Sequence, residues 1–460
     1  MNESKTIKTD AKSHSDYSLQ LNRWFLKPIG AWPYFSTTST LEKVISVSLI
    51  ILCYVVILFS IIPCVAHLIF EDDSFYRKVR VFGPLGHWFI GGINYTNLLF
   101  RSKNISDCVK HIETDWRIVT KEKQQQVMLK HAKFGRYVSA ICAIFVHSGI
   151  MSYCIVSASS TQVIKVGNET RTIRSLPLGV YNRMIPVDTS PANEIVLVMQ
   201  FLSAFITDSS GIGFYTLASV LAAHACGQLS VLTIWISDYV NEAGNRKEDA
   251  SFRKIGTIVE HHLRTLDFIA RIEEVMSWVC MTELFRCVLA ICMVGYYIVT
   301  VHMGYQIYVV FIIKRKLTIN VVLVPDNDKI LNLLLYEDDF DIVLCHISIV
   351  VLNQGEWSDH DVRSLASYFI IFASVTFNTF LLCYIGELLT EQCMKVGEIV
   401  YMTNWYILPR NRILELILII ARSSVVIEIT AGKLIHMSIH TFGDVMRLAF
   451  AYLNVLCQMT

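Results

Sequence analysis

The stretch Ser438–Gln458, SIHTFGDVMRLAFAYLNVLCQ, sets the interpretation of the rest of the chain. Its apolar residues predict a helix in which Leu448, Ala451, Val455 and Gln458 recur at three- and four-residue steps, so that they share one face. A lone helix in lipid needs no such stripe, because lipid accepts apolar residues all round. Spacing alone leaves two interpretations open: ordinary helix packing, and a helix that lines a narrow axis shared by symmetric copies.

The composition is that of a polytopic helical membrane protein. Of the 460 residues, 53% are hydrophobic and 17% are charged, and the mean hydropathy is +0.46. These values exclude an ordinary soluble domain and indicate an all-α membrane protein. A net charge of +1, without a basic run that contains aromatic residues, gives no reason to expect nucleic acid as a partner. The thirteen cysteines are scattered and predict neither a disulfide framework nor a metal site.

Apolar runs predict seven transmembrane helices in a single domain over residues 1–460. The expected spans are about 44–70, 82–100, 137–158, 194–223, 276–298, 365–385 and 411–458, the last broken near residue 431. An amphipathic segment over 18–35 is expected at the membrane surface. Residues 224–272 are expected to extend spans four and five as helices. The N-terminus is polar without an apolar core, so we expect no secretory signal peptide.

Basic residues predict the orientation of the chain. Most Lys and Arg residues lie in the N-terminal segment and in the loops after spans two, four and six. This places the N-terminus in the cytoplasm and the C-terminus outside, the opposite of a G-protein-coupled receptor. The loop with Arg77, Lys78 and Arg80 runs against this assignment. Asn168 begins an Asn-Glu-Thr triplet that would face the exterior and is a predicted glycosylation site.

Residues 299–355, between the fifth and sixth predicted spans, carry no recognisable motif and are interpreted as an atypical insert. The insert opens at Val299, whose codons begin with GT, and closes near Gln354, which CAG can encode. We therefore hypothesise a retained intron translated in frame. The rival interpretation is a genuine extra loop with a re-entrant apolar stretch.

No catalytic constellation or cofactor motif stands out, so no enzyme is expected. His224, Cys226, His261 and His262 lack further ligands at useful spacing, which favours polar helix packing over a metal site. Glu283 and Arg286 lie one turn apart within a predicted span and are expected to satisfy each other. Asp208 is equally consistent with a wet cavity and with packing.

The C-terminal third carries a set of residues that resembles the insect odorant receptors. The matching pieces are Tyr401-Met-Thr-Asn-Trp-Tyr406, Leu408-Pro409, Arg422-Ser423-Ser424, Ala431-Gly432-Lys433, Ser438, Thr441-Phe442 and Tyr452. The set is specific only as an ensemble. The ending also resembles that of gustatory receptors, but Ala451 and Met459 replace the outer Thr and Phe of that pattern, which favours the odorant branch.

The resemblance implies an odorant-gated, non-selective cation channel that a tuning subunit forms with a shared co-receptor, as a tetramer in the plasma membrane of a sensory neuron dendrite. It implies that Val455 and Met459 form an apolar constriction and that Gln458 lines the pore. It further implies subunit contacts around Trp405, Tyr406 and Pro409. An apolar ring would close such a pore by dewetting.

The outer halves of spans two, three, four and six offer aromatic and Met side chains with a few hydroxyls, which suit a small, volatile, mostly apolar ligand. For any single residue, packing is the simpler explanation, and the resemblance supports the set only as a group. The candidate pocket residues are Trp88, Phe89, Ser148, Met151, Ser152, Met199, Phe205, Tyr368 and Phe372.

Two other classes remain as alternatives. A metabotropic receptor coupled to a G protein would need the opposite orientation and an Asp-Arg-Tyr motif after span three, where Ala158-Ser159-Ser160 stands instead. A transporter would be expected to show inverted repeats, which are not evident. A gustatory-type receptor is the nearest variant of the main hypothesis.

Overall fold

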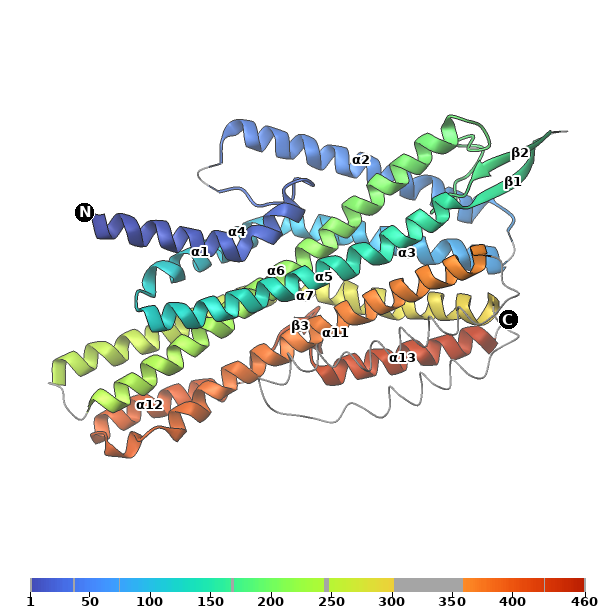
Figure 1. The fold of residues 1–460 in the computed structure, drawn as a ribbon. Helices are drawn as coiled ribbons and strands as arrows, with labels where there is room; N and C mark the ends of the chain where they lie inside the picture. Colours follow the sequence, from blue (N-terminus) through green and yellow to red (C-terminus); the bar gives the residue numbers. More distant parts are fainter. Residues whose placement is uncertain are drawn as a thin grey trace.

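The computed structural model describes residues 2–35, 38–73, 75–166, 169–243, 248–301, 359–425 and 427–458. Long helices run along one common axis and form an elongated bundle (Figure 1). The helices are α1 (Asn2–Leu26), α2 (Thr40–Phe70), α3 (Phe75–Phe100), α4 (Ser102–Ile118), α5 (Glu122–Ser159), α6 (Ala192–Ala243), α7 (Glu248–Val301), α11 (Asp359–Met402), α12 (Arg410–Ser423) and α13 (Ile439–Gln458), with a short 3-10 turn at Trp405–Ile407. Two antiparallel hairpins pair β1 (Thr161–Val166) with β2 (Glu169–Arg174), and β3 (Thr430–Ala431) with β4 (Ile435–His436).

Helix α2 shows how the sequence produces a membrane helix. A capping box starts it: the Ser39 hydroxyl accepts from the Glu42 amide at 3.2 Å, and the Glu42 carboxylate accepts from the Ser39 amide at 3.1 Å. The body of the helix is apolar all round, and only 22% of its most apolar window is buried within the chain. Ile51 and Leu52 are 60% and 56% exposed. Such outward apolar side chains are typical of a helix that faces lipid.

Five helices are long and apolar enough to cross a membrane, judged by length and composition over the described residues: α2, α5, α6, α7 and α11. They contain the first, third, fourth, fifth and sixth predicted spans. The second span lies in α3, which carries Arg77 and Lys78 in its first turn, and the end of the last span lies in α13, which carries Asp444 and Arg447. These two helices are not among the five.

Helix α6 is the centre of the bundle. Within its membrane-length window 83% of the residues are buried, and it contacts α1, α2, α3, α5, α7 and α11. Small residues allow these close approaches: a Cβ at Gly213 would lie 2.2 Å from Leu26, and one at Gly135 would lie 2.8 Å from Ala223. Leu26 is fully buried, so the N-terminal segment packs into the bundle rather than lying apart from it.

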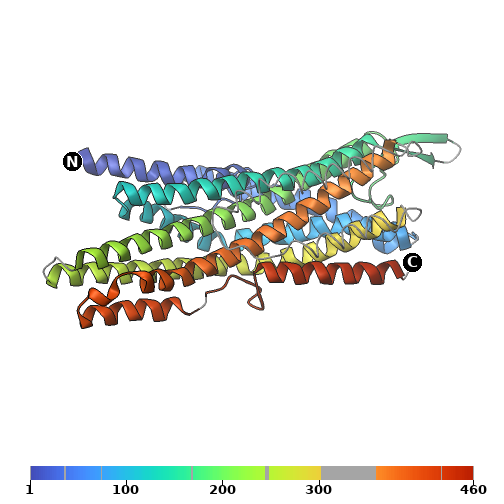
Figure 2. The same ribbon diagram turned by 60° about the horizontal axis from the view of Figure 1, so that its bottom comes forward.

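Helices α6 and α7 are much longer than one bilayer crossing. They contain 52 and 54 residues, which corresponds to about 80 Å each at the helical rise of about 1.5 Å per residue, against a hydrocarbon core of about 30 Å. Both run on through residues 224–272 as helix except at the undescribed 244–247. Helix α12 and the ends of α5 and α11 lie along these extensions (Figure 2).

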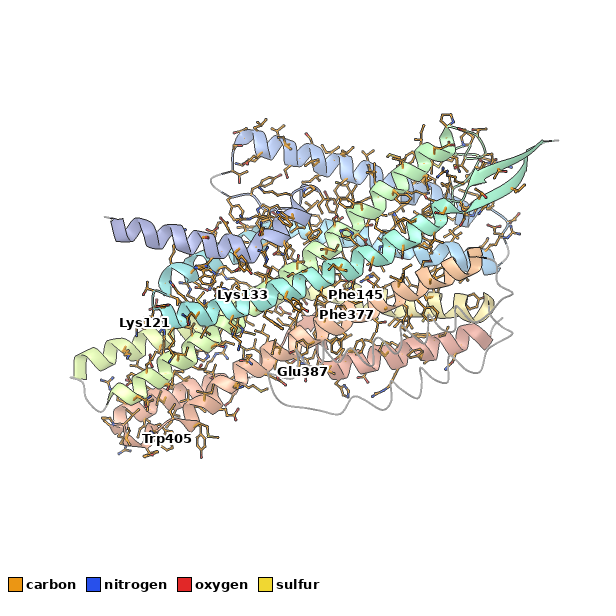
Figure 3. The ribbon with its side chains drawn as sticks, in the orientation of Figure 1. Lys121, Lys133, Phe145, Phe377, Glu387 and Trp405 are labelled. Carbon is orange, nitrogen blue, oxygen red and sulfur yellow. The ribbon has the colours of Figure 1, made fainter. Side chains whose placement is uncertain are left out.

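The chain breaks between α12 and α13, where the sequence predicted a break near 431. Gly432 and Lys433 have positive φ values of 61° and 60°, which turn β3 into β4. The Gly432 amide donates to the Ser277 carbonyl at 2.8 Å, and the Lys433 amide donates to the Ser277 hydroxyl at 3.1 Å. The hairpin is thus bound to α7. Glu387 of α11, labelled in Figure 3, then accepts a hydrogen bond of 2.7 Å from the Ile439 amide at the start of α13.

Two predictions fall outside the described residues. Asn168 is one, so the structure does not bear on its glycosylation. The insert at 299–355 is the other, apart from its first three residues, which continue α7 to Val301.

Candidate functional site

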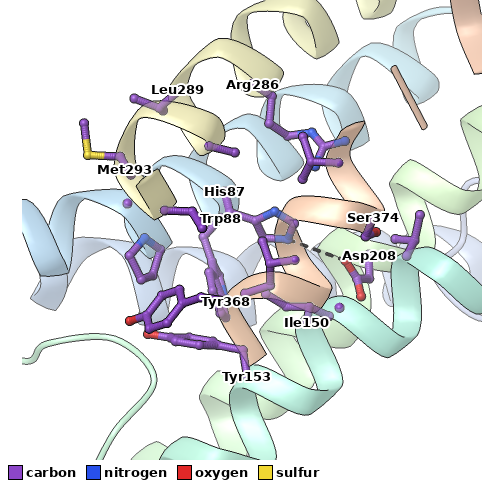
Figure 4. Close-up of a pocket in the computed structure, with 18 of the residues that line it drawn as sticks. His87, Trp88, Ile150, Tyr153, Asp208, Arg286, Leu289, Met293, Tyr368 and Ser374 are labelled. Carbon is purple, nitrogen blue, oxygen red and sulfur yellow. Dashed lines mark ion pairs between the residues drawn. The ribbon is translucent and has the colours of Figure 1, made fainter. Parts of the chain in front are cut away.

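A cavity of about 90 Å³ lies in the bundle between α3, α5, α6, α7 and α11 (Figure 4). Trp88, Tyr153 and Tyr368 supply aromatic walls, and Leu289 and Met293 supply aliphatic ones. Polar groups are few and include His87, Asp208, Arg286 and Ser374. The lining is therefore mainly apolar with a few convergent polar groups, as expected of a site for a small organic ligand.

Small residues bring the helices around the cavity together. A Cβ at Gly86 of α3 would lie 2.7 Å from Leu289 of α7, and one at Gly149 of α5 would lie 3.3 Å from Ser374 of α11. Beside the cavity, the rings of Phe145 and Phe377 stack with their centroids 4.6 Å apart, which joins α5 to α11 (Figure 3). The cavity is thus a gap left between closely packed helices.

Two of the nine predicted pocket residues, Trp88 and Tyr368, line this cavity. Met151 packs against the buried cluster that contains Trp88, while Ser152 donates to the Gly149 carbonyl at 2.8 Å. Met199 and Phe372 pack against the main core.

The remaining three, Ser148, Phe89 and Phe205, are exposed on outer helix faces, the last two at 56% and 45%. The physical reason is rotational phase: Phe89 follows Trp88 by one residue and so points about 100° away from it.

Helix α7 also forms a wall of the cavity, which was not predicted from the sequence. This helix contributes Arg286, Leu289, Ala290, Met293 and Val294. The repeat at 286, 289–290 and 293–294 has helical spacing, and it faces the glycines at 83 and 86 that the sequence shows in span two. The helical repeat in α7 and the glycines in span two were together the sequence pattern that could have identified this wall.

A polar network next to the cavity crosses the bundle at Glu283. Arg286 Nε donates to Glu283 at 2.7 Å, as expected for residues one turn apart. Tyr215 of α6 also donates to this carboxylate, and Asn94 of α3 donates to its other oxygen at 2.7 Å. Glu283 is 2% exposed, so its charge is compensated by Arg286 and by donors from two further helices.

Helix α7 joins the cavity to α13. Leu289 and Met293 face the cavity, while Cys292 Sγ donates to the Ala449 carbonyl of α13 at 3.3 Å. A Cβ on Gly295 would lie 2.5 Å from Leu453 of α13. One helix therefore contacts both the cavity and the last helix of the chain.

Helix α13 has one covered face and one open face. Ala449 and Leu453 are buried against α7, whereas Leu448, Tyr452 and Val455 are 47%, 55% and 54% exposed. Ala451 is also exposed. The stripe that the sequence singled out is therefore uncovered within the described chain. The side chain of Gln458 and the whole of Met459 lie outside the described residues.

The predicted subunit-contact region lies at the far end of the bundle. Trp405 is half-buried, and its indole donates to the Tyr401 carbonyl at 3.1 Å. Tyr406 is 67% exposed, and Pro409 caps the start of α12. Neighbouring Met402 and Ile407 are exposed as well. Together they make an apolar surface at this end of the molecule.

One of the histidines considered for metal binding, His224, belongs to a buried ionic cluster around Asp115 of α4, whereas His261 Nε2 lies 3.4 Å from the Gln228 carbonyl. His224 lies 2.9 Å from the Asp115 carboxylate, and Arg264 lies 2.7 Å from the other oxygen. Burial raises the pKa of Asp115, but the hydrogen bond and charge of His224, with the charges of His111 and Arg264, outweigh this and lower the pKa below its usual value. Burial lowers the pKa of His111 to about 4. Over the described residues no group of three or more metal-ligating side chains is found.

Comparison with known proteins places the chain in a family. The model of the 7tm Odorant receptor family matches residues 79–315 and 342–450. The gap between the two matched stretches, residues 316–341, lies within the atypical insert. Odorant receptor 2a of Drosophila melanogaster is 31% identical over 117 residues, which is 25% of this chain and 29% of that protein. The matched part thus spans less than a third of this relative.

The fold is also that of solved structures. The insect olfactory receptor OR5 from Machilis hrabei matches with a TM-score of 0.68 over 97% of this chain and 100% of that chain, at 14% identity. The same receptor in complex with eugenol matches with a TM-score of 0.69 over 98% of this chain and 100% of that chain, at 12% identity. The helical membrane fold predicted from the sequence is confirmed. The family match covers most of the chain and confirms the resemblance seen in its C-terminal third: this protein belongs to the insect odorant receptor family.

Proposed function

We propose that this receptor is a tuning subunit of an odorant-gated, non-selective cation channel, which assembles with a shared co-receptor, as a heterotetramer, in the plasma membrane of a sensory neuron dendrite. The observation that carries the proposal is the position of α7, which lines the cavity with Leu289 and Met293 and contacts α13 through Cys292 and Gly295. A ligand in the cavity therefore acts directly on the helix that supports α13.

The open face of α13 supports a role in the pore. Val455 and Tyr452 lie on the exposed face of α13, away from its contact with α7, where they can face a central axis shared by several subunits. An apolar ring at Val455 and Met459 would close that axis by dewetting, so that a small outward shift suffices for conduction. Gln458 would offer its amide to a passing ion. The exposed surface around Tyr406 and Ile407 would be covered by neighbouring subunits.

The cavity supports a small odorant as the ligand. Its volume of about 90 Å³ gives room for a compact molecule, since about 10–15 Å³ on the same measure is enough for one water. The related receptor solved with eugenol supports binding of small odorants by this fold. To open the channel, the ligand must bind the open state more tightly than the closed one. We place the N-terminus in the cytoplasm and the C-terminus outside, from the distribution of basic residues.

The contact between Gly295 and Leu453 allows a direct test. Gly295→Ala places a methyl group against Leu453, and Leu453→Val in the same chain removes part of the clash. With the co-receptor present, Gly295→Ala should change the odorant concentration that gives half-maximal current, and the double variant should restore it.

Gly443→Ala on α13 is the matched control, because no heavy atom lies within 4 Å of the new methyl group. Surface expression is measured for each variant. If Gly295→Ala and Gly443→Ala give the same dose–response curve as the unmodified receptor, α7 does not transmit binding to α13. Odorant responses carried by a G protein without any ligand-gated current would favour the metabotropic alternative.

A further inference from the structure

The cavity contains a buried carboxylate whose oxygens lack hydrogen-bond donors. Asp208 of α6 is 2% exposed, and neither of its carboxylate oxygens has a hydrogen-bond partner among the described residues. Burying a carboxylate without donors is unfavourable. The side chain therefore has capacity for a further donor, besides the two imidazoles that approach it.

Two imidazoles approach Asp208 but stay beyond good hydrogen-bond distance. His87 Nε2 of α3 lies 3.5 Å from Oδ1, and His147 Nδ1 of α5 lies 3.5 Å from Oδ2. Both distances exceed the usual range of about 2.7–3.2 Å for N–H···O bonds. His87 Nε2 also has no hydrogen-bond partner among the described residues. Figure 4 shows His87 and Asp208 facing each other at the cavity wall.

The cation that lines the cavity is already paired. Arg286 donates to Glu283 at 2.7 Å and contacts the Tyr215 hydroxyl at 2.5 Å. Glu283 and Arg286 therefore form a neutral pair, and no ion pair between Arg286 and Asp208 is found among the described residues. The site as a whole attracts a positive charge.

The other walls favour an organic cation over a hydrated metal ion. The rings of Tyr153 and Tyr368 lie 6.0 Å apart, and Trp88 is fully buried beside them. The Tyr153 hydroxyl donates to the Pro177 carbonyl at 2.9 Å, which fixes its ring in place. Aromatic faces attract ammonium groups, whereas Ca²⁺ and Mg²⁺ require six or more oxygen ligands, which this cavity does not provide among its described residues.

We infer that the ligand of this receptor is a small, compact monoamine, bound in its protonated form with the ammonium on Asp208 and the hydrocarbon part against Leu289 and Met293. This inference rests on the proposed role of the cavity as the odorant site. His87, whose Nε2 has no hydrogen-bond partner among the described residues, lines the cavity beside Asp208. An alcohol of the same shape brings one donor and no charge, so it leaves the carboxylate uncompensated.

The test compares matched ligand pairs on the purified full-length receptor in detergent. The probes are isoamylamine against isoamyl alcohol and cyclopentylamine against cyclopentanol, and the readout is the rise in unfolding temperature with ligand concentration. The amines are expected to bind at least tenfold more tightly than the matched alcohols, since a charge-assisted hydrogen bond is stronger than a neutral one. Equal or tighter binding of the alcohols would overturn the inference, and this comparison needs no variant.

Asp208→Asn keeps the shape of the side chain and removes its charge. It should weaken amine binding at least tenfold and change alcohol binding less than twofold. Asp107→Asn on α4 is the control, because Asp107 is a surface carboxylate paired with Lys110 outside the cavity. If Asp208→Asn weakens both ligand types equally, or neither, then Asp208 has a structural role only. Stabilisation by sodium chloride in place of the amines would identify an inorganic cation and also overturn the inference.

The same ligands are applied to cells that express the receptor with the co-receptor. Amine binding that depends on Asp208 but evokes no current would contradict the channel proposal and leave the inference standing. Currents evoked by alcohols, with no binding of amines, would support the channel and refute the inference.

Discussion

Gly386 of α11 is the position where a single methyl group has the most predictable effect. A Cβ there would lie 2.3 Å from the Met437 carbonyl oxygen and 2.8 Å from the Met437 Cβ. Neither atom is the end of a flexible side chain, so neither rotates away. Met437 is fully buried, and its amide donates to the Ile429 carbonyl at 2.9 Å. The segment that leads into α13 is therefore held directly on Gly386.

Gly386→Ala must open this contact by about 1 Å before it reaches an ordinary van der Waals distance. Overpacking of this kind costs about 1–3 kcal/mol. The control is Gly256→Ala in α7, where no heavy atom lies within 4 Å of the new methyl group. In a helix interior, replacing Gly by Ala stabilises by about 0.5–1 kcal/mol in both variants, so the two should differ by the overpacking cost of about 1–3 kcal/mol.

The assay is thermal unfolding of the detergent-purified receptor, followed by the loss of its monodisperse peak in size-exclusion chromatography. Gly386→Ala should unfold at a lower temperature than the unmodified receptor, and Gly256→Ala at the same or a higher one. Resting current measured with the co-receptor should change only for Gly386→Ala, because this substitution also displaces the neighbouring Glu387 from the start of α13. Equal unfolding temperatures for the two variants, at equal expression, would refute this account of the contact.

Further predictions address the gate, the orientation, the partner and the ionic cluster. Val455→Ser should hydrate the proposed constriction and raise the current measured without odorant, whereas Leu453→Ser should lower surface expression. An unchanged resting current in Val455→Ser would indicate that α13 only packs against its neighbours. Asn168→Gln should remove the glycan and shift the mass of the expressed protein, and a glycan on Asn104 instead would reverse the proposed orientation. The receptor expressed alone should give little odorant-evoked current, and robust currents would indicate a homomeric channel. The pKa of His111 is lowered to about 4 in the folded state, so the unfolded chain takes up this proton at a higher pH than the folded chain does. Stability measured by thermal unfolding should therefore fall as the pH drops from about 6.5 to 4. His111→Gln should make stability depend less on pH in this range.

The sequence predicted where the helices lie better than it predicted which side of each helix faces its neighbours. Hydropathy located the helices that became α2, α5, α6, α7 and α11, because lipid imposes long apolar runs whatever the neighbours are. The helical extensions expected over residues 224–272 are also present in α6 and α7 outside the undescribed 244–247, although packing rather than lipid holds them. The break at Gly432 could be predicted because a glycine with positive φ has a local cause.

The pocket shows where the inference from sequence stops. Trp88 lines the cavity and Phe89 does not, although both are aromatic residues in the same helix. When a helix is apolar all round, its sequence does not reveal which side faces its neighbours. Met293 was missed for the same reason. In contrast, Glu283 and Arg286 were paired correctly, because charges within a membrane helix require a partner close by.

The cavity and the open face of α13 have no residue in common among the described parts of the chain, and both α7 and α11 line the cavity and contact α13. Substitutions at His87, Asp208 or Tyr368 therefore alter what is detected without touching Tyr452 or Val455. In the proposed channel, the first set would determine the ligand and the second set would face other subunits. Ligand recognition and subunit compatibility would then depend on different residues, so that one can change without the other.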